Sequence, residues 1–296
     1  MSLPRIGITA GDPAGIGPEI ARKAMADPRV VAVCEPLYYG SQQPFAPGVL
    51  SAGAGQAAYE TIVRAVRDAQ AGGIHGIATA PINKEALALA GVPWRGHTEM
   101  LASLTNASNV AMMFWSDKLR VVLATIHIPL ASVPAALTID SVSGIIELTN
   151  RELPRFGITR PRLALAGLNP HAGEHGILGH EETDVLEPAV ARSAKAGVDI
   201  AGPFPGDTIF LRAIRGEFDA VIACYHDQGL IPIKMAAFGE AVNVTLGLPI
   251  IRTSVDHGTA FDIAGKDMAD PESMVQAVLL AAKLAGRRSA DLQVGG

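Results

Sequence analysis

Short apolar runs that end in polar turns constrain the fold of this 296-residue chain more than any other feature of its sequence. Runs such as residues 5–10, 74–79 and 220–224 alternate with segments of helical periodicity such as residues 56–71. Buried strands that alternate with helices predict an α/β protein with largely parallel sheets. The polar link 116–118 between two apolar runs indicates a hairpin, so we expect the sheet to be mixed.

Three of the apolar runs lead to a histidine: His127, His171 and His226. Because the carboxyl ends of parallel strands share one edge of a sheet, we expect these residues to form a common site. They are separated by 44 and 55 residues, whereas zinc-finger ligands come in close pairs. The spacing fits a catalytic site with three protein ligands and an open position, where imidazoles favour a metal such as zinc. The alternative is three separate hydrogen-bonded histidines, and His175 and His180 are weaker candidates.

Two aspartates, Asp207 and Asp227, are candidate carboxylates for the same site. One of them could orient a ligand histidine or relay a proton. Asp227 directly follows His226, which favours a role at the site. The alternative for Asp207 is a structural one, as the cap of a short helix over residues 208–214.

Lys234, Asn243 and Arg252 lie on consecutive elements in otherwise apolar surroundings. A cation inside an apolar run is costly unless it is paired. An anionic substrate would supply the partner, and the fork of an arginine suits a phosphate or a carboxylate. The alternative is an ion pair with a nearby acid, Glu240 or Asp256.

His97 and Thr98 lie at the expected start of a helix, with Thr98 as a plausible N-cap residue. The N-terminus of a helix offers backbone N–H groups and a favourable dipole to an anion. These two residues could therefore bind the same anion as the three polar residues above.

Two glycine-containing loops bear on nucleotide binding. Residues 11–17 follow a strand, but their glycines are spaced G-x-x-x-G-x-G and not G-x-G-x-x-G, so we reject a Rossmann fingerprint there. Asp12 would also place a negative charge near a pyrophosphate, and a tight turn carrying one functional acid is the preferred interpretation. Residues 256–266 are either a nucleotide-binding loop or a solvated connector.

Charge and composition exclude several classes of function. The net charge is −5 and no basic run is present, which argues against nucleic-acid binding. The N-terminus has no signal-peptide pattern, and no apolar run approaches the ~20 residues that span a bilayer. Cys34 and Cys224 lie in apolar runs and are expected to be buried free thiols. We therefore expect a cytoplasmic protein with neither a membrane nor a nucleic-acid partner.

Taken together, several long motifs in this order resemble the 4-hydroxythreonine-4-phosphate dehydrogenases of pyridoxal phosphate synthesis. The resemblance runs nearly from end to end of the chain. The motifs that carry it are residues 11–19, 96–99, 169–174, 225–229 and 243–259.

The resemblance implies a fold similar to that of isocitrate and isopropylmalate dehydrogenases. Two αβα domains with mixed, mostly parallel sheets would lie around a central cleft. Residues 1–109 with 241–296 would form a discontinuous domain on the dinucleotide side. Residues 110–240 would form the domain of the metal, the substrate and the dimer interface.

The resemblance also implies an NAD(P)-dependent oxidation, with decarboxylation, of a phosphorylated hydroxy acid, 4-phosphohydroxy-L-threonine. It implies a homodimer with a shared active site and a divalent metal, typically zinc, with magnesium or cobalt as alternatives. The implied metal ligands are His127, His171 and His226, from both chains. The candidate catalytic residues are Asp207, Asp227 and Lys234. The implied substrate-binding residues are His97, Thr98, Lys234, Asn243 and Arg252. The implied residues for NAD or NADP are Asp256, His257, Gly258, Thr259, Asp262 and Lys266.

Other activities remain open from the sequence. Similar proteins act on D-threonate or D-erythronate 4-phosphate, or on a terephthalate cis-dihydrodiol, and the segment 40–55 is shorter here than is usual for the family. A hydrolase or lyase that uses the same histidines, and a protein that senses a phosphorylated metabolite, are the alternatives from other classes.

Overall fold

The computed structural model describes residues 3–94 and 96–294, and the chain forms two compact units. Unit 1 consists of Met1–Val110 together with Val242–Gly296, and unit 2 consists of Ala111–Ala241. Unit 1 is therefore built from both ends of the chain, and unit 2 is continuous in sequence.

The described residues of unit 1 form five strands in the order β2–β1–β3–β10–β9. Neighbouring strands are parallel, except that β9 and β10 are antiparallel. The strands are β1 (Arg5–Thr9), β2 (Glu35–Tyr39), β3 (Gly76–Thr79), β9 (Val242–Leu246) and β10 (Arg252–Ser254).

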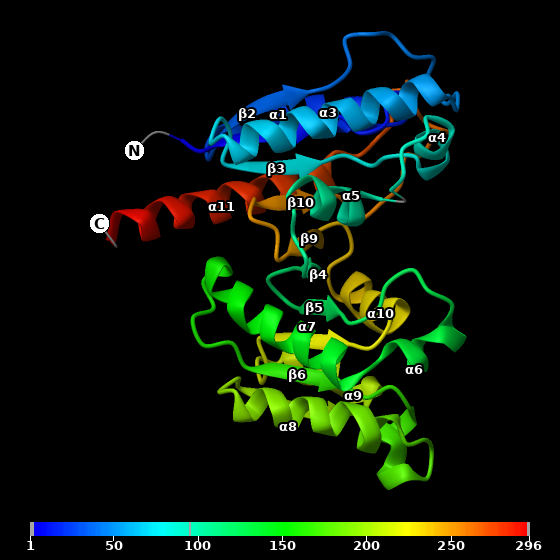
Figure 1. The fold of residues 1–296 in the computed structure, drawn as a ribbon. Helices are drawn as coiled ribbons and strands as arrows, with labels where there is room; N and C mark the ends of the chain where they lie inside the picture. The colour runs from blue at the N-terminus through cyan, green and yellow to red at the C-terminus, as the bar shows by residue number, and fades with distance from the viewer. Residues whose placement is uncertain (1–2, 95, 295–296) are drawn as a thin grey trace. The chain divides into compact units, whose positions relative to one another are not determined.

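Helices cover both faces of these strands (Figure 1). One face carries α1 (Gly17–Ala26), α2 (Pro28–Val31) and the C-terminal helix α11 (Glu272–Val294). The other carries α3 (Ala52–Gln70), α4 (Lys84–Leu89) and α5 (His97–Leu104). Aliphatic and methionine side chains fill the second interface, among them Ile62, Ile77, Leu87, Met100 and Leu101. Their burial is the main contribution to the stability of this unit.

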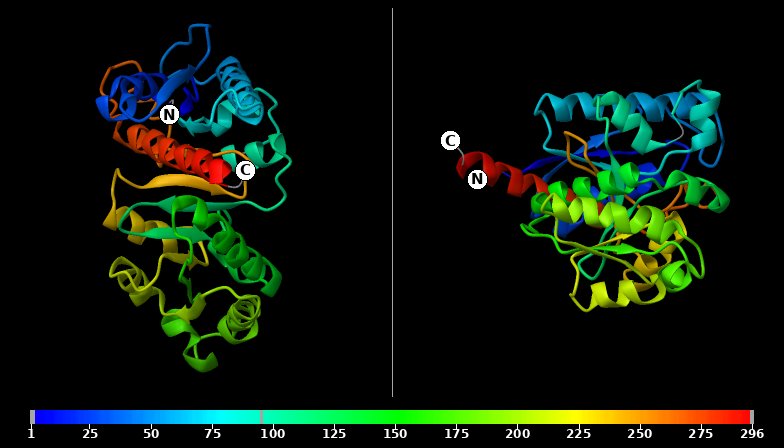
Figure 2. Two further views of the ribbon diagram at one scale, coloured as in Figure 1. Left: turned by 90° about the vertical axis from the view of Figure 1, so that its left-hand side faces the viewer. Right: turned by 60° about the horizontal axis from the view of Figure 1, so that its bottom comes forward.

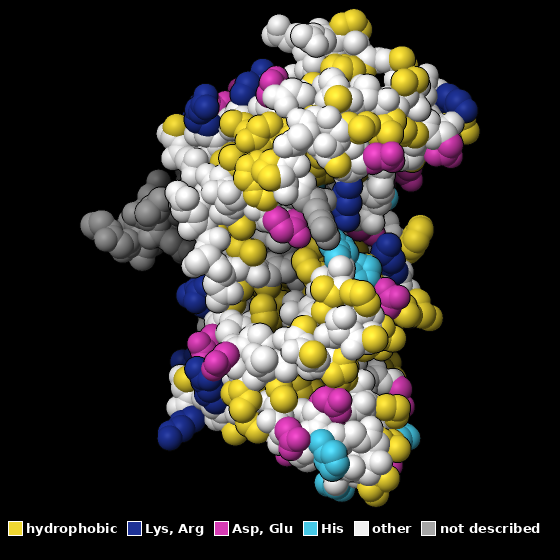
Figure 3. Space-filling model, turned by 45° about the vertical axis from the view of Figure 1, so that its right-hand side comes forward, with side chains coloured by type: hydrophobic (Ala, Val, Ile, Leu, Met, Phe, Trp, Pro, Cys, Tyr) yellow, Lys and Arg dark blue, Asp and Glu magenta, His cyan; other side chains and the backbone are white. Residues whose placement is uncertain are grey.

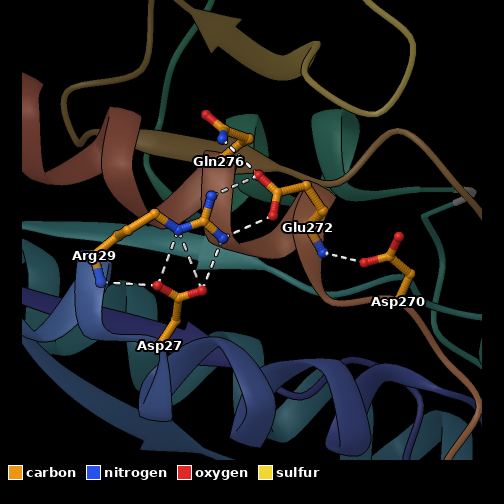
Figure 4. Close-up of polar contacts among 5 residues, drawn as sticks. All are labelled: Asp27, Arg29, Asp270, Glu272 and Gln276. Atoms are coloured by element: carbon orange, nitrogen blue, oxygen red, sulfur yellow. Dashed lines mark hydrogen bonds and ion pairs between the residues drawn. The ribbon is translucent and has the colours of Figure 1, made fainter.

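Arg29 of helix α2 contacts the C-terminal helix α11 through hydrogen bonds (Figure 4). The guanidinium of Arg29 donates to the carboxylate of Asp27 at 2.8 Å and to that of Glu272 at 2.7 Å. Hydrogen bonding to Arg29 lowers the pKa of both carboxyl groups. Asp27 also accepts a hydrogen bond from the backbone N–H of Arg29 and so caps α2. Asp270 accepts a hydrogen bond from the backbone N–H of Glu272, the first residue of α11.

Residues 111–241 of unit 2, all of which are described, form five strands in the order β4–β5–β8–β6–β7. The antiparallel pair β4/β5 is the expected hairpin, and β5, β8, β6 and β7 run parallel to their neighbours. The strands are β4 (Ala111–Trp115), β5 (Arg120–Leu123), β6 (Leu163–Ala166), β7 (Ile200–Phe204) and β8 (Ala220–Ala223).

The helices of unit 2 again lie on both faces of the strands (Figure 2). On one face lie α7 (Ile139–Glu152) and α8 (Glu187–Lys195). On the other lie α9 (Gly206–Ile214) and α10 (His226–Ala236), and α6 (Val133–Ala136) is a short helix before α7. The mixed, mostly parallel α/β fold expected from the alternating runs is confirmed.

Three local expectations were wrong. Residues after Cys224 form helix α10 and not only a glycine-containing turn, although Gly229 and Pro232 lie inside the helix. Helix α3 begins at Ala52, before the expected residue 56, because the hydroxyl of Ser51 caps it by accepting a hydrogen bond from Ala54 N–H at 3.1 Å. Amphipathic periodicity predicts a helix over residues 271–285, whereas helix α11 continues to Val294.

Within the part of the chain that the structure describes, no single helix has the length and hydropathy of a membrane span. Leu130–Ala136 and Ile139–Phe156 meet those criteria only as a pair, and the pair is bent by 88°. Cys34 and Cys224 are buried free thiols, as expected. Burial raises the pKa of Cys224 to about 12, so it is held as an unreactive thiol.

Candidate active site

The three histidines follow three neighbouring strands of unit 2. Strand β8 pairs with β5 on one side and with β6 on the other, all in parallel. His127 follows β5, His171 follows β6, and His226 follows β8 directly. The structure therefore places all three on segments that leave the same edge of the sheet.

Two of these histidines meet within one chain. The ring centroids of His127 and His226 are 5.6 Å apart, with the rings tilted by 41°. Among residues 3–94 and 96–294, no group of three or more His, Cys, Asp or Glu side chains is close enough to hold a metal ion. His171 is thus not gathered with the other two inside one chain, and it lies exposed on its own loop.

Asp227 determines which nitrogen of His226 can bind a metal. The Nδ1 atom of His226 lies 2.7 Å from the Oδ1 atom of Asp227. A carboxylate only accepts hydrogen bonds, so Nδ1 carries the proton in this pair and Nε2 keeps its lone pair. Carboxylate–histidine pairs of this kind typically orient metal-binding imidazoles. Two imidazoles, one held by a carboxylate, therefore fit two of the three ligands of a zinc site.

The two other candidate residues of unit 2, Asp207 and Lys234, lie on helices α9 and α10. Asp207 is the second residue of α9 and is exposed. The expectation that it caps this helix was wrong: the N-cap residue is Pro205, and no side chain caps the helix. Lys234 lies half-buried in the last turn of α10, and it makes no hydrogen bond or ion pair with the described residues.

In unit 1, one face of the sheet carries a row of polar side chains. Ser254 pairs with Asn243 on β9 and with Thr79 on β3. Side chains on a strand alternate between faces, so Arg252 lies on the same face as Ser254. Its nearest polar neighbour on β9 is Thr245. Five polar side chains of three adjacent strands thus share one face.

Arg252 is the central charge of this row. Its side chain is 3% exposed, and it donates to the hydroxyls of Thr79 at 2.8 Å and Thr245 at 3.0 Å. It forms no ion pair with any described carboxylate, and its Nε atom has no partner. Burial without a counter-charge lowers the pKa of its guanidinium to about 9.

The expected alternative for Arg252, an ion pair with a local acid, was wrong. Glu240 lies 3.6 Å from the ammonium of Lys118, and Asp256 accepts a hydrogen bond from Ser273. Arg252 therefore has no counter-charge among the described residues.

His97 and Asn243 are among the described residues of unit 1 whose polar atoms lack partners. The Nε2 atom of His97 and the Oδ1 atom of Asn243 are buried without a hydrogen bond. Burial, and then the charge of Arg252, lower the pKa of His97 well below its ordinary value, so its ring is neutral at pH 7. His97 is the first residue of α5. Thr98 follows it. The expectation that Thr98 is the N-cap residue was wrong, because the N-cap residue is Gly96.

The loop 256–266 is anchored to the turn after β1. The N–H of Ile16 donates to the carbonyl of Thr259 at 3.0 Å. A Cβ atom at Gly15 would lie 2.9 Å from the same carbonyl, so only glycine allows this approach. His257 contacts the Gly258 carbonyl through Nδ1 at 3.0 Å, and its Nε2 is buried without a partner.

The remaining residues of this loop and its neighbours are also placed. Asp262 and Lys266 are exposed. Asp12, in the turn after β1, is fully buried: Oδ1 accepts a hydrogen bond from Ala14 N–H, and Oδ2 has no partner. Burial raises the pKa of its carboxyl group. The loop, the glycine turn and this acid therefore lie on one side of unit 1.

The pyridoxal phosphate biosynthetic protein PdxA family matches residues 16–281 of the chain. The chain belongs to this family. The resemblance stated from its motifs is thereby confirmed.

Curated relatives of this PdxA family member have two different names. A protein of Desulforapulum autotrophicum, named 4-hydroxythreonine-4-phosphate dehydrogenase, is 45% identical over 94% of this chain and 95% of its own length. A protein of Pectobacterium atrosepticum, named D-threonate 4-phosphate dehydrogenase, is 43% identical over 95% of this chain and 99% of its own. The first alignment spans 322 positions, so this PdxA chain of 296 residues lacks roughly forty of them.

Several solved structures are also similar to this chain. The 4-hydroxythreonine-4-phosphate dehydrogenase of Klebsiella pneumoniae has a TM-score of 0.87 and 40% identity, over 96% of this chain and 98% of that one. A terephthalate 1,2-cis-dihydrodiol dehydrogenase of Burkholderia xenovorans has a TM-score of 0.68 and 29% identity, over 95% and 98%. Isocitrate dehydrogenase of Methylococcus capsulatus, at 17% identity and a TM-score of 0.55 over 100% and 89%, shares the fold.

The sequence did not single out three residues that the structure places at these sites. Thr79 and Thr245 hold Arg252, and their signal was only a threonine in each of two apolar strands. Glu182 is buried beneath the His171 loop and accepts hydrogen bonds from Leu168 and Asn169. The sequence pattern that could have indicated Glu182 is an acidic residue inside a helical segment, on the side expected to face the core.

Proposed function

We propose that this PdxA family member is a metal-dependent, NAD(P)-linked dehydrogenase that oxidises and decarboxylates a phosphorylated hydroxy acid. The substrate we favour is 4-phosphohydroxy-L-threonine, as in the names of the relatives from Desulforapulum autotrophicum and Klebsiella pneumoniae. The observation that carries the proposal is the buried, unpaired Arg252 among neutral polar groups.

Arg252 supports an anionic substrate for a physical reason. A buried charge without a partner is strongly unfavourable, and proteins tolerate it where a ligand supplies the opposite charge. Asn243 and His97 add two unpartnered polar atoms in the same unit, and neither brings a charge at pH 7. We assign Arg252, Asn243, His97 and Thr98 of unit 1 to the substrate anion. Lys234 stays a predicted substrate-binding residue.

His127, His171 and His226 are the residues that would hold the divalent metal, for which zinc is our first choice. When bound, the metal would lower the pKa of the substrate hydroxyl, and the oxidised nicotinamide would accept the hydride. We assign the relay of the hydroxyl proton to Asp227, which is exposed beside His226, and Asp207 is the second candidate for this role. The oxidised product is a ketone β to a carboxylate, which loses carbon dioxide.

We assign the dinucleotide to unit 1, on residues Asp256, His257, Gly258, Thr259, Asp262 and Lys266. The anchoring of Thr259 to the turn after β1 gives this loop a fixed position, which supports a binding role. The buried Nε2 of His257 without a partner is a further group that a ligand could satisfy.

A homodimer with a shared site would explain why one chain gathers only two histidines. Large apolar side chains lie exposed just after each histidine of the predicted ligand set, which is typical of an interaction surface. Figure 3 shows exposed histidines with hydrophobic side chains beside them on one face. The apolar residues are Ile128, Leu130, Ile177, Leu178, Ile231, Met235 and Phe238, and both Met235 and Phe238 are 84% exposed.

One alternative substrate has a specific observation in its favour. The D-threonate 4-phosphate dehydrogenase of Pectobacterium atrosepticum is 43% identical to this chain, nearly the same as the 45% of the other relative. A phosphorylated hydroxy acid is common to both, so the anion site described above serves either substrate.

The test is NAD⁺ and NADP⁺ reduction by the zinc-loaded protein with 4-phosphohydroxy-L-threonine, D-threonate 4-phosphate and a carboxylated cis-dihydrodiol. We expect turnover of a phosphorylated substrate, and no loss of it in the His175→Ala control. His171→Ala should lose both zinc and activity, although His171 and His175 are both exposed and share the same left-handed backbone turn. A His171→Ala protein with full zinc content and full activity would overturn the metal assignment.

A further inference from the structure

We propose that Glu182 is the positioning residue that fixes the loop of His171 and so makes this histidine available to the metal. The inference rests on the proposed function, because it takes His171 as a metal ligand. Glu182 would act without touching the metal or the substrate, through the backbone that presents His171.

The loop of His171 has an unusual backbone. From His171 to Gly176, six consecutive residues have positive φ angles, between 43° and 91°. Left-handed backbone costs roughly 1–2 kcal/mol for each residue that has a Cβ atom, and it normally occurs at single residues. His171, Ala172, Glu174 and His175 all carry a Cβ atom. A turn of this kind persists only where the surrounding structure holds it in place.

Glu182 supplies hydrogen bonds at the start of this turn. Its side chain is 1% exposed, and its Oε1 atom accepts from the N–H groups of Leu168 at 2.8 Å and Asn169 at 2.7 Å. Its Oε2 atom accepts from the Nδ2 atom of Asn169 at 2.9 Å. The carboxylate therefore holds the two residues that lead from β6 into Pro170 and His171.

Two glycines make room for the carboxylate. A Cβ atom at Gly173 would lie 2.6 Å from Oε2 of Glu182, and one at Gly167 would lie 3.3 Å from Oε1. Gly173 lies inside the left-handed turn and Gly167 lies before it. The carboxylate is thus enclosed between the strand end and the turn.

The charge of Glu182 is held by N–H groups alone. It forms no ion pair with a cation among the described residues, although it is almost fully buried. Hydrogen bonds to a carboxylate are about twice as strong as those between neutral groups, which makes this an effective hold on the backbone. A glutamine at 182 would keep one acceptor oxygen but turn an NH₂ group toward the Nδ2 donor of Asn169.

A ligand held in place before the metal arrives binds it more tightly, because less freedom is lost on binding. Groups that orient metal ligands typically change metal affinity by about 10- to 100-fold when they are mutated. Glu182 orients the backbone of the ligand segment instead of its ring. We therefore expect its loss to weaken metal binding while the strands of unit 2 stay folded.

The experiment compares the full-length Glu182→Gln, Glu181→Gln, His171→Ala and wild-type proteins. Zinc affinity is measured by competition with a chromogenic chelator, and the visible absorption of the cobalt-substituted proteins reports ligand geometry. Glu181 is the matched control because its Oε2 atom accepts from the side chain of Asn169 at 2.7 Å, whereas the N–H groups of Leu168 and Asn169 donate to Glu182. We expect Glu182→Gln to bind zinc about 10- to 100-fold more weakly, with an altered cobalt spectrum. Glu181→Gln should change the affinity less than about threefold.

The outcomes separate this inference from the proposed function. If His171→Ala loses zinc affinity while Glu182→Gln keeps both the affinity and the cobalt spectrum of the wild type, the positioning role is overturned and the metal assignment stands. If His171→Ala keeps its affinity, both fail. A Glu182→Gln protein that does not fold is replaced by Asn169→Ala, which keeps the backbone hydrogen bonds to Glu182. Its affinity should fall in the same direction, and an unchanged affinity would overturn the inference.

Discussion

Replacing Arg252 by glutamine should separate binding from stability in an unusual way. For a structural arginine, loss of the charge destabilises the protein and leaves catalysis intact. Arg252 has no carboxylate partner among the described residues, so its charge is a cost to the ligand-free protein. We expect Arg252→Gln to lose substrate affinity while its ligand-free stability changes little.

The magnitude follows from the pKa. Burial lowers the pKa of Arg252 from its ordinary value to about 9, and at ~1.36 kcal/mol for each pKa unit the burial cost is at most about 5 kcal/mol. Two charge-assisted hydrogen bonds, to Thr79 and Thr245, oppose this with roughly 1.5–3 kcal/mol each. The two contributions nearly cancel, so the free energy of unfolding should change by less than about 2 kcal/mol. Truncating a buried charged partner of a ligand costs about 2–5 kcal/mol, which predicts a KM about 30- to 5000-fold higher.

The assay combines denaturant unfolding of the ligand-free protein with steady-state NAD(P)⁺ reduction. Arg151→Gln is the control, since Arg151 is 61% exposed and should affect neither quantity by a measurable amount. A ligand-free Arg252→Gln protein that is 3–5 kcal/mol less stable, with an unchanged KM, would refute the reasoning. Arg252 would then be a structural residue that acts through its hydrogen bonds to Thr79 and Thr245, and not part of an anion site.

Two further predictions concern pH and assembly. Because native Arg252 loses its proton near pH 9 and the unfolded residue only at a much higher pH, the burial cost of its charge applies below pH 9 and is relieved above it. Inorganic phosphate should therefore raise the Tm by its full amount at pH 8 and by progressively less as the pH passes 9, as measured by scanning calorimetry. An equal rise in Tm at pH 8 and pH 10 would contradict this. Met235→Glu should convert the proposed dimer to monomers in light scattering and weaken zinc binding, because a charge would enter the proposed interface. Val49→Glu, at a residue of unit 1 that is 54% exposed, should stay dimeric, and a wild-type protein that is monomeric would rule out the shared site.

The strands could be predicted from the sequence because burial on both faces requires short uninterrupted apolar runs. Strands β6 and β8 are fully buried over four residues each. Helix α10 could not be predicted, because Gly229 and Pro232 favour turns by propensity. Here the glycine lets the helix approach β5: a Cβ atom at Gly229 would lie 2.6 Å from the Cδ2 atom of Leu123. Tertiary packing decided this helix, and packing is not visible in a local pattern.

The candidate site residues also fall into those that could be predicted from the sequence and those that could not. Histidines at strand ends could be found because parallel strands bring their carboxyl ends together, and His127 and His226 do meet. The isolation of Arg252 could not, because Glu240 is near it in sequence but is engaged by Lys118. Glu182 could not be found either, because it contacts the segment before a left-handed turn that no propensity scale describes.

The division of unit 1 between the two ends of the chain has a consequence for its synthesis on the ribosome. Residues 1–110 emerge first, but β10, which completes the hydrogen bonding of β3, belongs to the last segment. Until then the edge of β3 lacks its partner, and an unpaired apolar strand edge invites misassociation. Unit 2, which is continuous, can fold in the meantime. A nascent chain that ends before Arg252 therefore has its histidines but not the charge that we assign to the substrate.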